Sequence, residues 1–325
     1  MFRTALTPSP APFRIAHRDR LLLLGSCFTE HIGARLSAGK FATLTNPFGI
    51  AYNPASILYC LERVRAVDRD FGEAELFENA GLWRSWAHHG SFAKADKTAT
   101  LAGINAAYRE AAAWLPGCSR LLLTFGTADV FALRDTGQIV ANNHKMPAAD
   151  FTSRRLSVAE IVDSAVAVLE KIRKKKPDLQ AIVTVSPVRH LREGAVANQR
   201  SKATLVLACD GICRQLPYAH YFPAYELLLD DLRDYRFYAA DMIHPSEVAV
   251  DYIWQHFCDT YFSAETKTLL QAITKIQTAA QHRPLHPDAP EHQRFVQAQL
   301  AALERLQQDW PSLDFEKERN NLMMR

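Results

Sequence analysis

Leu21-Leu22-Leu23-Leu24-Gly25-Ser26-Cys27-Phe28-Thr29 is the stretch that decides the fold of this protein. Four successive leucines without polar alternation are typical of a strand buried on both faces of a parallel sheet. Gly25 and Ser26 end the apolar run, and apolar residues then recur at helical spacing, at Phe28, Ile32 and Leu36. The pattern predicts a strand, a tight turn and a helix.

Three further apolar runs share this character, and each is stopped by small or polar residues. They cover residues 41–45, 121–125 and 181–185. Helical patterns lie between or after them, at residues 157–172 and 245–257. Strands that alternate with helices predict an α/β protein with a doubly wound, mostly parallel sheet, which is a three-layer α/β/α sandwich.

Two regions do not follow this alternation of strands and helices. Residues 55–118 separate the second and third expected strands and are too long for one crossover helix, so we expect an insertion there. Residues 263–325 are rich in Gln, Ala and Leu. They predict a helical C-terminal extension after a catalytic domain at residues 1–262. Such helices could also join copies of the chain into a homo-oligomer.

Composition excludes several classes of protein. With 325 residues, 48% of them hydrophobic, the chain can bury a large core, and a formal charge of +3 does not indicate nucleic acid. The six cysteines are scattered without a CxxC pair, which favours reduced thiols and no metal. No segment is typical of a signal peptide or of a membrane span. We therefore expect a cytoplasmic protein without a cofactor and without membrane insertion.

The carboxyl ends of parallel strands meet at one edge of a sheet, where ligands bind. Ser26 lies there at the start of a helix, so its hydroxyl could face the crevice, and the free Cys27 amide could stabilise a negative oxygen. The same position suits a serine that only caps the helix. This turn alone does not decide between the two roles.

A second motif, Asp241-Met242-Ile243-His244-Pro245, favours the catalytic interpretation. Because His244 precedes a proline, it belongs to an extended loop before the next helix. Asp241 can curl back and accept a hydrogen bond from the imidazole, which orients a general base for the serine. Together the two motifs predict a nucleophile, a base and an orienting carboxylate.

These motifs resemble the GSCFA family, a branch of the SGNH (GDSL-like) hydrolases. The resemblance spans roughly residues 20–260 and rests on short stretches at 25–29, 46–50, 52–54, 125–127, 143–145, 186–190 and 241–245. It implies a flavodoxin-like sheet with the strand order 2-1-3-4-5. It also implies that Ser26 is the nucleophile and that Asp241 and His244 complete the catalytic set.

The chain departs from this family pattern at the oxyanion hole. SGNH enzymes typically carry Gly-x-Asn after the third strand, whereas this chain has Gly126-Thr127-Ala128-Asp129. We expect a substitute donor among three side chains, Asn46, Thr127 and Asn143. By analogy with the superfamily, the Gly49 amide would be a second backbone donor beside the helix start.

Other residues at this edge have both a structural and a functional interpretation. Arg189 and His190 follow the fourth strand and could dock a substrate anion, although Arg189 could instead pair with Glu226. His89 could line one wall of the pocket from the insertion, or be a surface histidine. Cys27 would be reactive at a helix N-terminus if exposed, but we expect it to turn toward the sheet.

The leading hypothesis is a serine-dependent hydrolase of carboxylic esters, such as acyl or acetyl esters of a carbohydrate or another small molecule. An acyltransferase would use the same acyl-serine and pass the acyl group to an alcohol. A ligand-binding protein could retain the fold without the chemistry. The absent asparagine favours this last alternative, and the intact Ser26, Asp241 and His244 oppose it.

Overall fold

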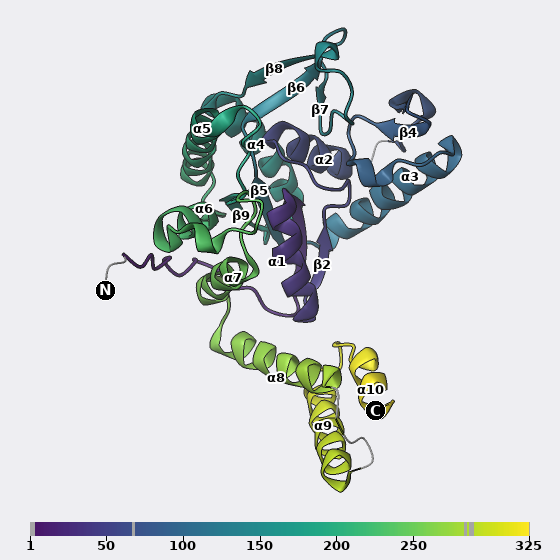
Figure 1. The fold of residues 1–325 in the computed structure, drawn as a ribbon, viewed down its shortest axis with the longest axis vertical. Helices are drawn as coiled ribbons and strands as arrows, with labels where there is room; N and C mark the ends of the chain where they lie inside the picture. Colours follow the sequence, from purple (N-terminus) through teal and green to yellow (C-terminus); the bar gives the residue numbers. More distant parts are fainter. Residues whose placement is uncertain (1–3, 67–68, 283–284, 286–288, 325) are drawn as a thin grey trace.

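The computed structural model describes residues 4–66, 69–282, 285 and 289–324. A five-stranded parallel sheet forms its centre, in the order β10-β9-β5-β1-β2 (Figure 1). Read from the other edge in chain order, this is 2-1-3-4-5, so the implied flavodoxin-like topology is confirmed. The strands are β1 (Arg20–Gly25), β2 (Ala42–Thr45), β5 (Arg120–Phe125), β9 (Gln180–Val185) and β10 (Ala219–Phe222).

Successive side chains of a strand point to opposite faces of the sheet, and the leucine runs use both. On β1, Leu22 and Leu24 belong to one apolar cluster, whereas Leu21 and Leu23 belong to another. All four are buried. Continuous apolar sequence is therefore required here, because neither face of the strand meets water.

Helices cover both faces and make the expected three layers (Figure 1). One face packs against α2 (Pro54–Ala66), α3 (Lys97–Trp114), α4 (Val158–Lys175) and α5 (Gly194–Gln215). The other packs against α1 (Cys27–Ala38), α6 (Ala224–Glu226) and α7 (Glu247–Tyr261). Side chains cap two of these helices at their starts: Ser157 and Glu160 form a capping box on α4, and Ser246 caps α7.

The edge strand β10 has no counterpart among the four apolar runs. Its sequence, Ala-His-Tyr-Phe, mixes polar and apolar residues, and only Phe222 is fully buried. An edge strand has one neighbour and is covered less completely, so it lacks the continuous apolar signal. Two small antiparallel sheets were also not expected: β3 (Leu76–Asn79) with β4 (Leu82–Ser85), and β6 (Asp129–Leu133) with β7 (Ile139–Val140) and β8 (Phe151–Arg155).

The C-terminal helices project from the main body (Figure 1). They are α8 (Ala264–Gln281), α9 (Pro290–Asp309) and α10 (Glu316–Met323), with an apolar cluster of their own. Lys40 binds the buried Glu318 at 2.9 Å, and Gln277 donates to the Ala38 carbonyl at 2.7 Å. These two contacts tie the projecting helices to the turn between α1 and β2.

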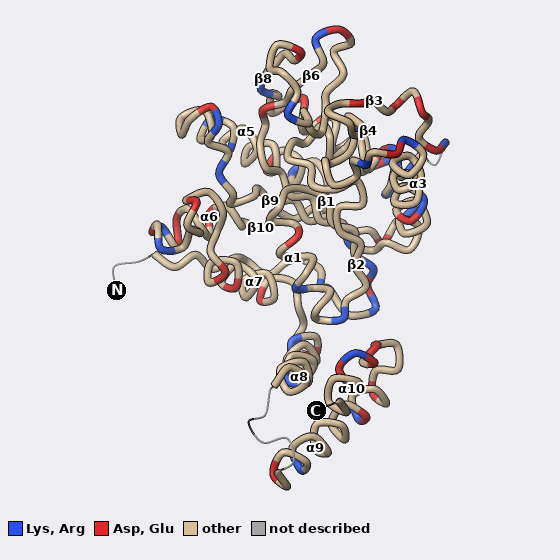
Figure 2. Tube along the Cα trace, turned by 45° about the vertical axis from the view of Figure 1, so that its right-hand side comes forward, with Lys and Arg blue, Asp and Glu red and all other residues tan. Residues whose placement is uncertain are grey.

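Charged residues lie mainly around the outside, while the central strands carry few (Figure 2). Among the residues that the structure describes, no helix has the length and apolar character that crossing a membrane requires.

His88 is a core residue of the insertion, with a fully buried side chain. Its Nδ1 lies 2.9 Å from the Ser85 hydroxyl, and its ring stacks on Phe48 with 4.6 Å between centroids. Burial lowers the pKa of His88 to about 3. Below about pH 6.5 the His88 ring therefore binds a proton in the unfolded chain but stays neutral in the folded protein.

We predict that the free energy of unfolding falls as the pH drops from about 6.5 toward 4. His88→Phe keeps the ring stacking and removes the titrating group, so this loss should become smaller. Urea denaturation at a series of pH values measures it. His89→Phe, the same substitution at the neighbouring histidine, is measured alongside as the control for introducing a phenylalanine. Equal slopes for wild type and His88→Phe would show that His88 does not cause the acid sensitivity.

Candidate active site

Ser26 stands at the turn from β1 into α1, and its side chain is fully buried. Its Oγ accepts the Phe28 N–H at 3.3 Å, so the hydroxyl caps the helix. This bond is long for an N–H···O contact, and the hydroxyl proton remains available for donation. The two interpretations of Ser26 are therefore compatible.

Gly25 brings the serine turn close to the neighbouring strand. Its φ is +151°, and a Cβ there would lie 2.3 Å from the Thr124 carbonyl oxygen. Side chains cannot approach backbone so closely, so glycine is required. The Ser26 N–H in turn donates to the Thr124 carbonyl, at 3.3 Å. The end of β1 is thus pressed against β5.

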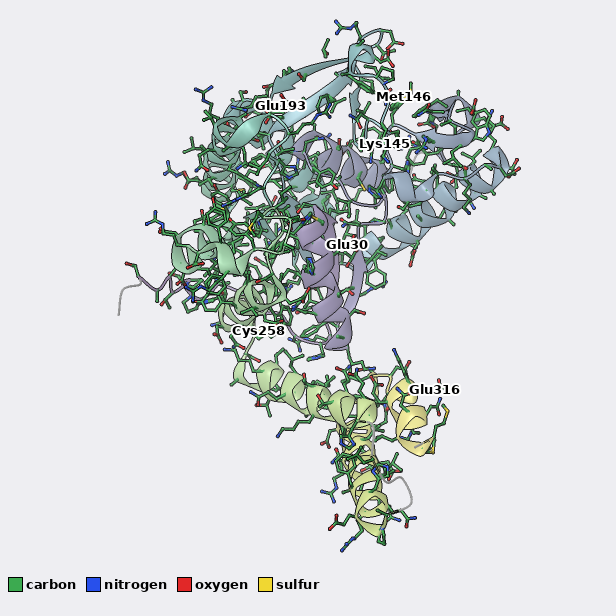
Figure 3. The ribbon with its side chains drawn as sticks, in the orientation of Figure 1. Glu30, Lys145, Met146, Glu193, Cys258 and Glu316 are labelled. Atoms are coloured by element: carbon green, nitrogen blue, oxygen red, sulfur yellow. The ribbon has the colours of Figure 1, made fainter. Side chains whose placement is uncertain are left out.

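Asn46 holds the other side of this turn. Its Oδ1 accepts the Gly25 N–H at 2.8 Å, and its Nδ2 donates to Glu30 Oε1 at 2.5 Å. Glu30 lies on α1, the helix that follows the serine (Figure 3). Both ends of the Asn46 amide therefore have partners, and these hydrogen bonds join β1, β2 and α1.

Asp241 and His244 form a close pair on the loop before α7. Asp241 Oδ2 lies 2.6 Å from His244 Nδ1, and Oδ1 accepts the backbone N–H groups of Ile243 and His244. The His244 backbone N–H, its imidazole and the Ile243 N–H lower the pKa of Asp241 to about 2. A carboxylate can only accept, so the proton of neutral His244 sits on Nδ1 and Nε2 is left as the base.

Arg189 fastens this loop to the segment after β9. Its backbone N–H donates to the Ile243 carbonyl at 3.2 Å, and its guanidinium donates to the Met242 carbonyl at 3.3 Å. The guanidinium also lies 4.0 Å from the Tyr238 ring centroid. The suggested partner Glu226 instead accepts a hydrogen bond from Tyr221 at 2.7 Å. Arg189 thus positions the histidine loop.

His190 points to the serine turn. A Cβ built on Gly126 would lie 3.0 Å from His190 Nε2 and 3.4 Å from Ser26 Cβ, so both side chains border the same point. Nε2 is buried without a hydrogen-bond partner among the described residues. The ring meets Tyr52 edge to face at 5.4 Å. Burial, followed by the charges of Lys202 and His244, lowers the pKa of His190 to about 4.

Two of the expected oxyanion donors are engaged elsewhere. The Gly49 N–H donates to the Asn46 carbonyl at 2.7 Å, which closes a turn. The Thr127 hydroxyl lies 3.0 Å from the Ser201 hydroxyl on α5. With the Asn46 amide also hydrogen-bonded, all three groups have partners in the elements around the serine, and their role as oxyanion donors stays a prediction.

Asn143 and His89 lie with the insertion, which makes a wall on the β2 side of the sheet. The loop of Asn143 begins where Ala141 donates to the Trp86 carbonyl at 2.8 Å, and His89 donates to the Phe48 carbonyl at 3.0 Å. Lys145 and Met146, which follow Asn143, lie beyond the start of α1 on this side (Figure 3). No hydrogen bond among the described residues joins Asn143 or His89 to the serine turn.

Cys27 is half buried, and burial raises the pKa of its thiol despite the Cys27 and Phe28 amides and the nearby Lys202. Its backbone N–H is the donor at the helix start with no protein partner among the described residues. The side chain therefore has little thiolate character, while the amide is free to bind an oxygen.

No hydrogen bond joins Ser26 to His244 among the described residues. The Asp241–His244 pair is half exposed, whereas Ser26 is covered. His244 is close enough to His190 to depress its pKa, and Arg189 holds both segments together. The catalytic roles of Ser26, Asp241 and His244 remain predictions, as does the choice of oxyanion donor.

Sequence analysis missed one buried residue at this edge, Lys202 on α5. The buried face of α5 follows helical spacing through Asn198, Ser201, Lys202, Leu205, Ala208, Cys209 and Ile212. The sequence does show that Lys202 falls at helical spacing among the apolar residues of this helix face, which could have identified it as buried. Within the described residues no group of three His, Cys, Asp or Glu side chains could hold a metal.

Residues 20–257 match the GSCFA family, and residues 273–323 match the C-terminal domain of GSCFA domain proteins. The chain belongs to the GSCFA family. Comparison with the curated proteins gave no match.

Three solved structures are similar to this GSCFA-family chain. One is described as a putative platelet activating factor from Streptococcus pneumonia, with 10% identity, a TM-score of 0.40, and coverage of 74% of this chain and 83% of that chain. The second is a carbohydrate esterase family 2 enzyme with a carbohydrate binding domain from Corynascus thermopiles (Myceliophthora fergusii). Its identity is 9% and its TM-score 0.38, and the match covers 82% of this chain and 69% of that chain. The third is a carbohydrate esterase family 3 protein from Talaromyces cellulolyticus. Its identity is 9% and its TM-score 0.35, and the match covers 79% of this chain and 99% of that chain.

We predict that His190 stays neutral across the physiological pH range, because burial penalises the imidazolium. In long-range ¹H–¹⁵N spectra its ring signals should not move between about pH 8 and 5, and its titration midpoint should lie near 4. The spectrum of His190→Gln assigns the signals. A midpoint at or above the usual value of about 6.5 would show that the ring is accessible to water.

Proposed function

We propose that this GSCFA-family protein cleaves carboxylic esters through an acyl-serine intermediate on Ser26. The observation that carries the proposal is the Asp241–His244 pair, with 2.6 Å between Oδ2 and Nδ1. It is tethered through Arg189 to the segment that brings His190 against the Ser26 turn. A carboxylate, an imidazole and a serine at one sheet edge are the components of serine-based acyl transfer.

In the first step, Ser26 Oγ attacks the ester carbonyl carbon and its proton passes to His244 Nε2. The C=O electron pair moves to oxygen and creates a tetrahedral anion, while Asp241 stabilises the imidazolium. Collapse of the anion breaks the bond to the alcohol, which leaves with the proton from His244. The acyl group is then bonded to Ser26.

In the second step, water adds to the acyl carbon and gives its proton to His244. When the acid leaves, that proton returns to Ser26 Oγ. The rotation that frees Oγ from its capping role breaks a hydrogen bond of 3.3 Å, which is weak and cheap to lose.

For the oxyanion, we infer two donors in place of the usual glycine amide and asparagine. The free Cys27 N–H lies at the positive end of α1, next to Ser26. The second donor is Nε2–H of neutral His190, whose nitrogen is buried without a partner. The crowding of Gly126, His190 and Tyr52 around the serine favours a small acyl group, such as acetyl on a carbohydrate or other small molecule.

We predict that Ser26→Ala abolishes hydrolysis of p-nitrophenyl acetate and labelling by a fluorophosphonate probe. Cys27→Ala should retain most of both, because its thiol is largely protonated and its backbone donor is unchanged. Steady-state rates and gel fluorescence measure the two effects.

The opposite pattern, with Ser26→Ala active and iodoacetamide inhibiting, would assign the nucleophile to Cys27. If Ser26→Ala kept both activity and labelling, the proposed function would be wrong. Adding an alcohol acceptor and analysing the products distinguishes hydrolysis from acyl transfer, since a transferase yields a new ester.

A further inference from the structure

Lys202 is a lysine of α5 whose side chain is 1% exposed. Its Nζ donates to the Gly126 carbonyl at 2.7 Å and to the Ser186 carbonyl at 2.6 Å. Gly126 follows β5 and Ser186 follows β9, so the ammonium bridges the carboxyl ends of two neighbouring strands. An ammonium has three N–H groups, and these two bonds account for two of them.

No carboxylate neutralises this cation among the described residues. Lys202 takes part in no ion pair there, and the groups facing it are the Cys27 thiol, the His190 ring and the Tyr225 ring. Burial lowers the pKa of Lys202 to about 7. Burying a cation without a carboxylate partner is unfavourable, so such a cation is expected where a negative charge must be met.

One of the two hydrogen bonds of Lys202 is made to a residue next to the serine turn. The carbonyl that accepts from Lys202 belongs to Gly126, the residue whose Cβ position borders both Ser26 and His190. Electrostatic interactions are stronger where water is excluded. Ser26 is fully buried, so the charge on Lys202 is poorly screened there.

We propose that Lys202 is a positioning residue that fixes the ends of β5 and β9 and supplies the positive potential for the tetrahedral anion formed on Ser26. This inference rests on the proposed ester cleavage. When Ser26 Oγ bonds to the carbonyl carbon and its proton moves to His244, a negative oxygen forms near the Lys202 Nζ, which the Gly126 and Ser186 carbonyls already hold in position. The negative charge favours the protonated form of Lys202. Nothing has to reorganise, which is the condition for an efficient electrostatic contribution.

Two substitutions separate the charge from the bridge. Lys202→Gln keeps N–H donors for the two carbonyls and removes the charge, whereas Lys202→Met removes both. For p-nitrophenyl acetate, we expect Lys202→Gln to lower kcat about a hundredfold, as for loss of one oxyanion contact, with KM changed less than about threefold. Lys202→Met should lose at least as much activity and also melt at a lower temperature.

Methylboronic acid, whose methyl group matches that of an acetyl ester, provides a binding readout that does not need turnover. Ser26 Oγ adds to boron and its proton passes to His244, so the adduct is a tetrahedral anion. Its Kd, measured by calorimetry, should rise in Lys202→Gln in proportion to the loss of kcat/KM. A merely structural role would shift KM and thermal stability without this selective loss of anion affinity.

Arg120→Gln is the matched control. Arg120 is also a partly buried cation that binds main-chain carbonyls, those of Arg14 and Ser119, but it lies at the opposite end of β5. It should lose stability and keep both kcat and boronate affinity.

Wild-type kcat and boronate affinity in Lys202→Gln would overturn the inference. If Lys202→Met alone lost activity, the lysine would be only a bridge and the electrostatic role would be wrong. These outcomes differ from failure of the proposed function, in which wild type itself would show no Ser26-dependent hydrolysis or labelling.

Discussion

The contact between Gly25 and the Thr124 carbonyl is the constraint on which the rest of the site depends. With no side chain at Gly25, the end of β1 lies against β5, and the next residue must begin α1. Asn46 locks the same turn from β2 by accepting the Gly25 N–H. Three strands therefore end at one level of the sheet, and the residues that follow them are brought to a common edge.

Most polar groups at this edge bind one another. Gly49, Asn46 and Thr127 each contact a neighbouring loop or helix, and Arg189 holds the loop of His244. A buried polar group without a partner is costly, so those that remain free are informative. Among the described residues they include the Nε2 of His190 and the Cys27 amide, both beside Ser26, together with the hydroxyls of Thr29 and Thr124 next to Gly25.

The elements outside the sheet have separate structural tasks. The insertion packs His88 against Phe48 of the main core, and its loops lie on the side of the site beyond β2. The C-terminal helices have their own apolar cluster and contact the body near Lys40, away from the serine turn. This separation agrees with two family matches, one over residues 20–257 and one over residues 273–323.

The sequence by itself determined the interior strands, because burial on both faces demands continuous apolar runs, and it determined the pairing of Asp241 with His244, because three residues of one loop suffice. It did not determine β10 or the small antiparallel sheets, whose strands are only partly covered. Only the tertiary structure decided which polar groups are already satisfied, and that Lys202 is buried between two carbonyls. Periodicity reports which side of an element is covered, whereas the partner of a polar group lies on another element whose position follows from packing.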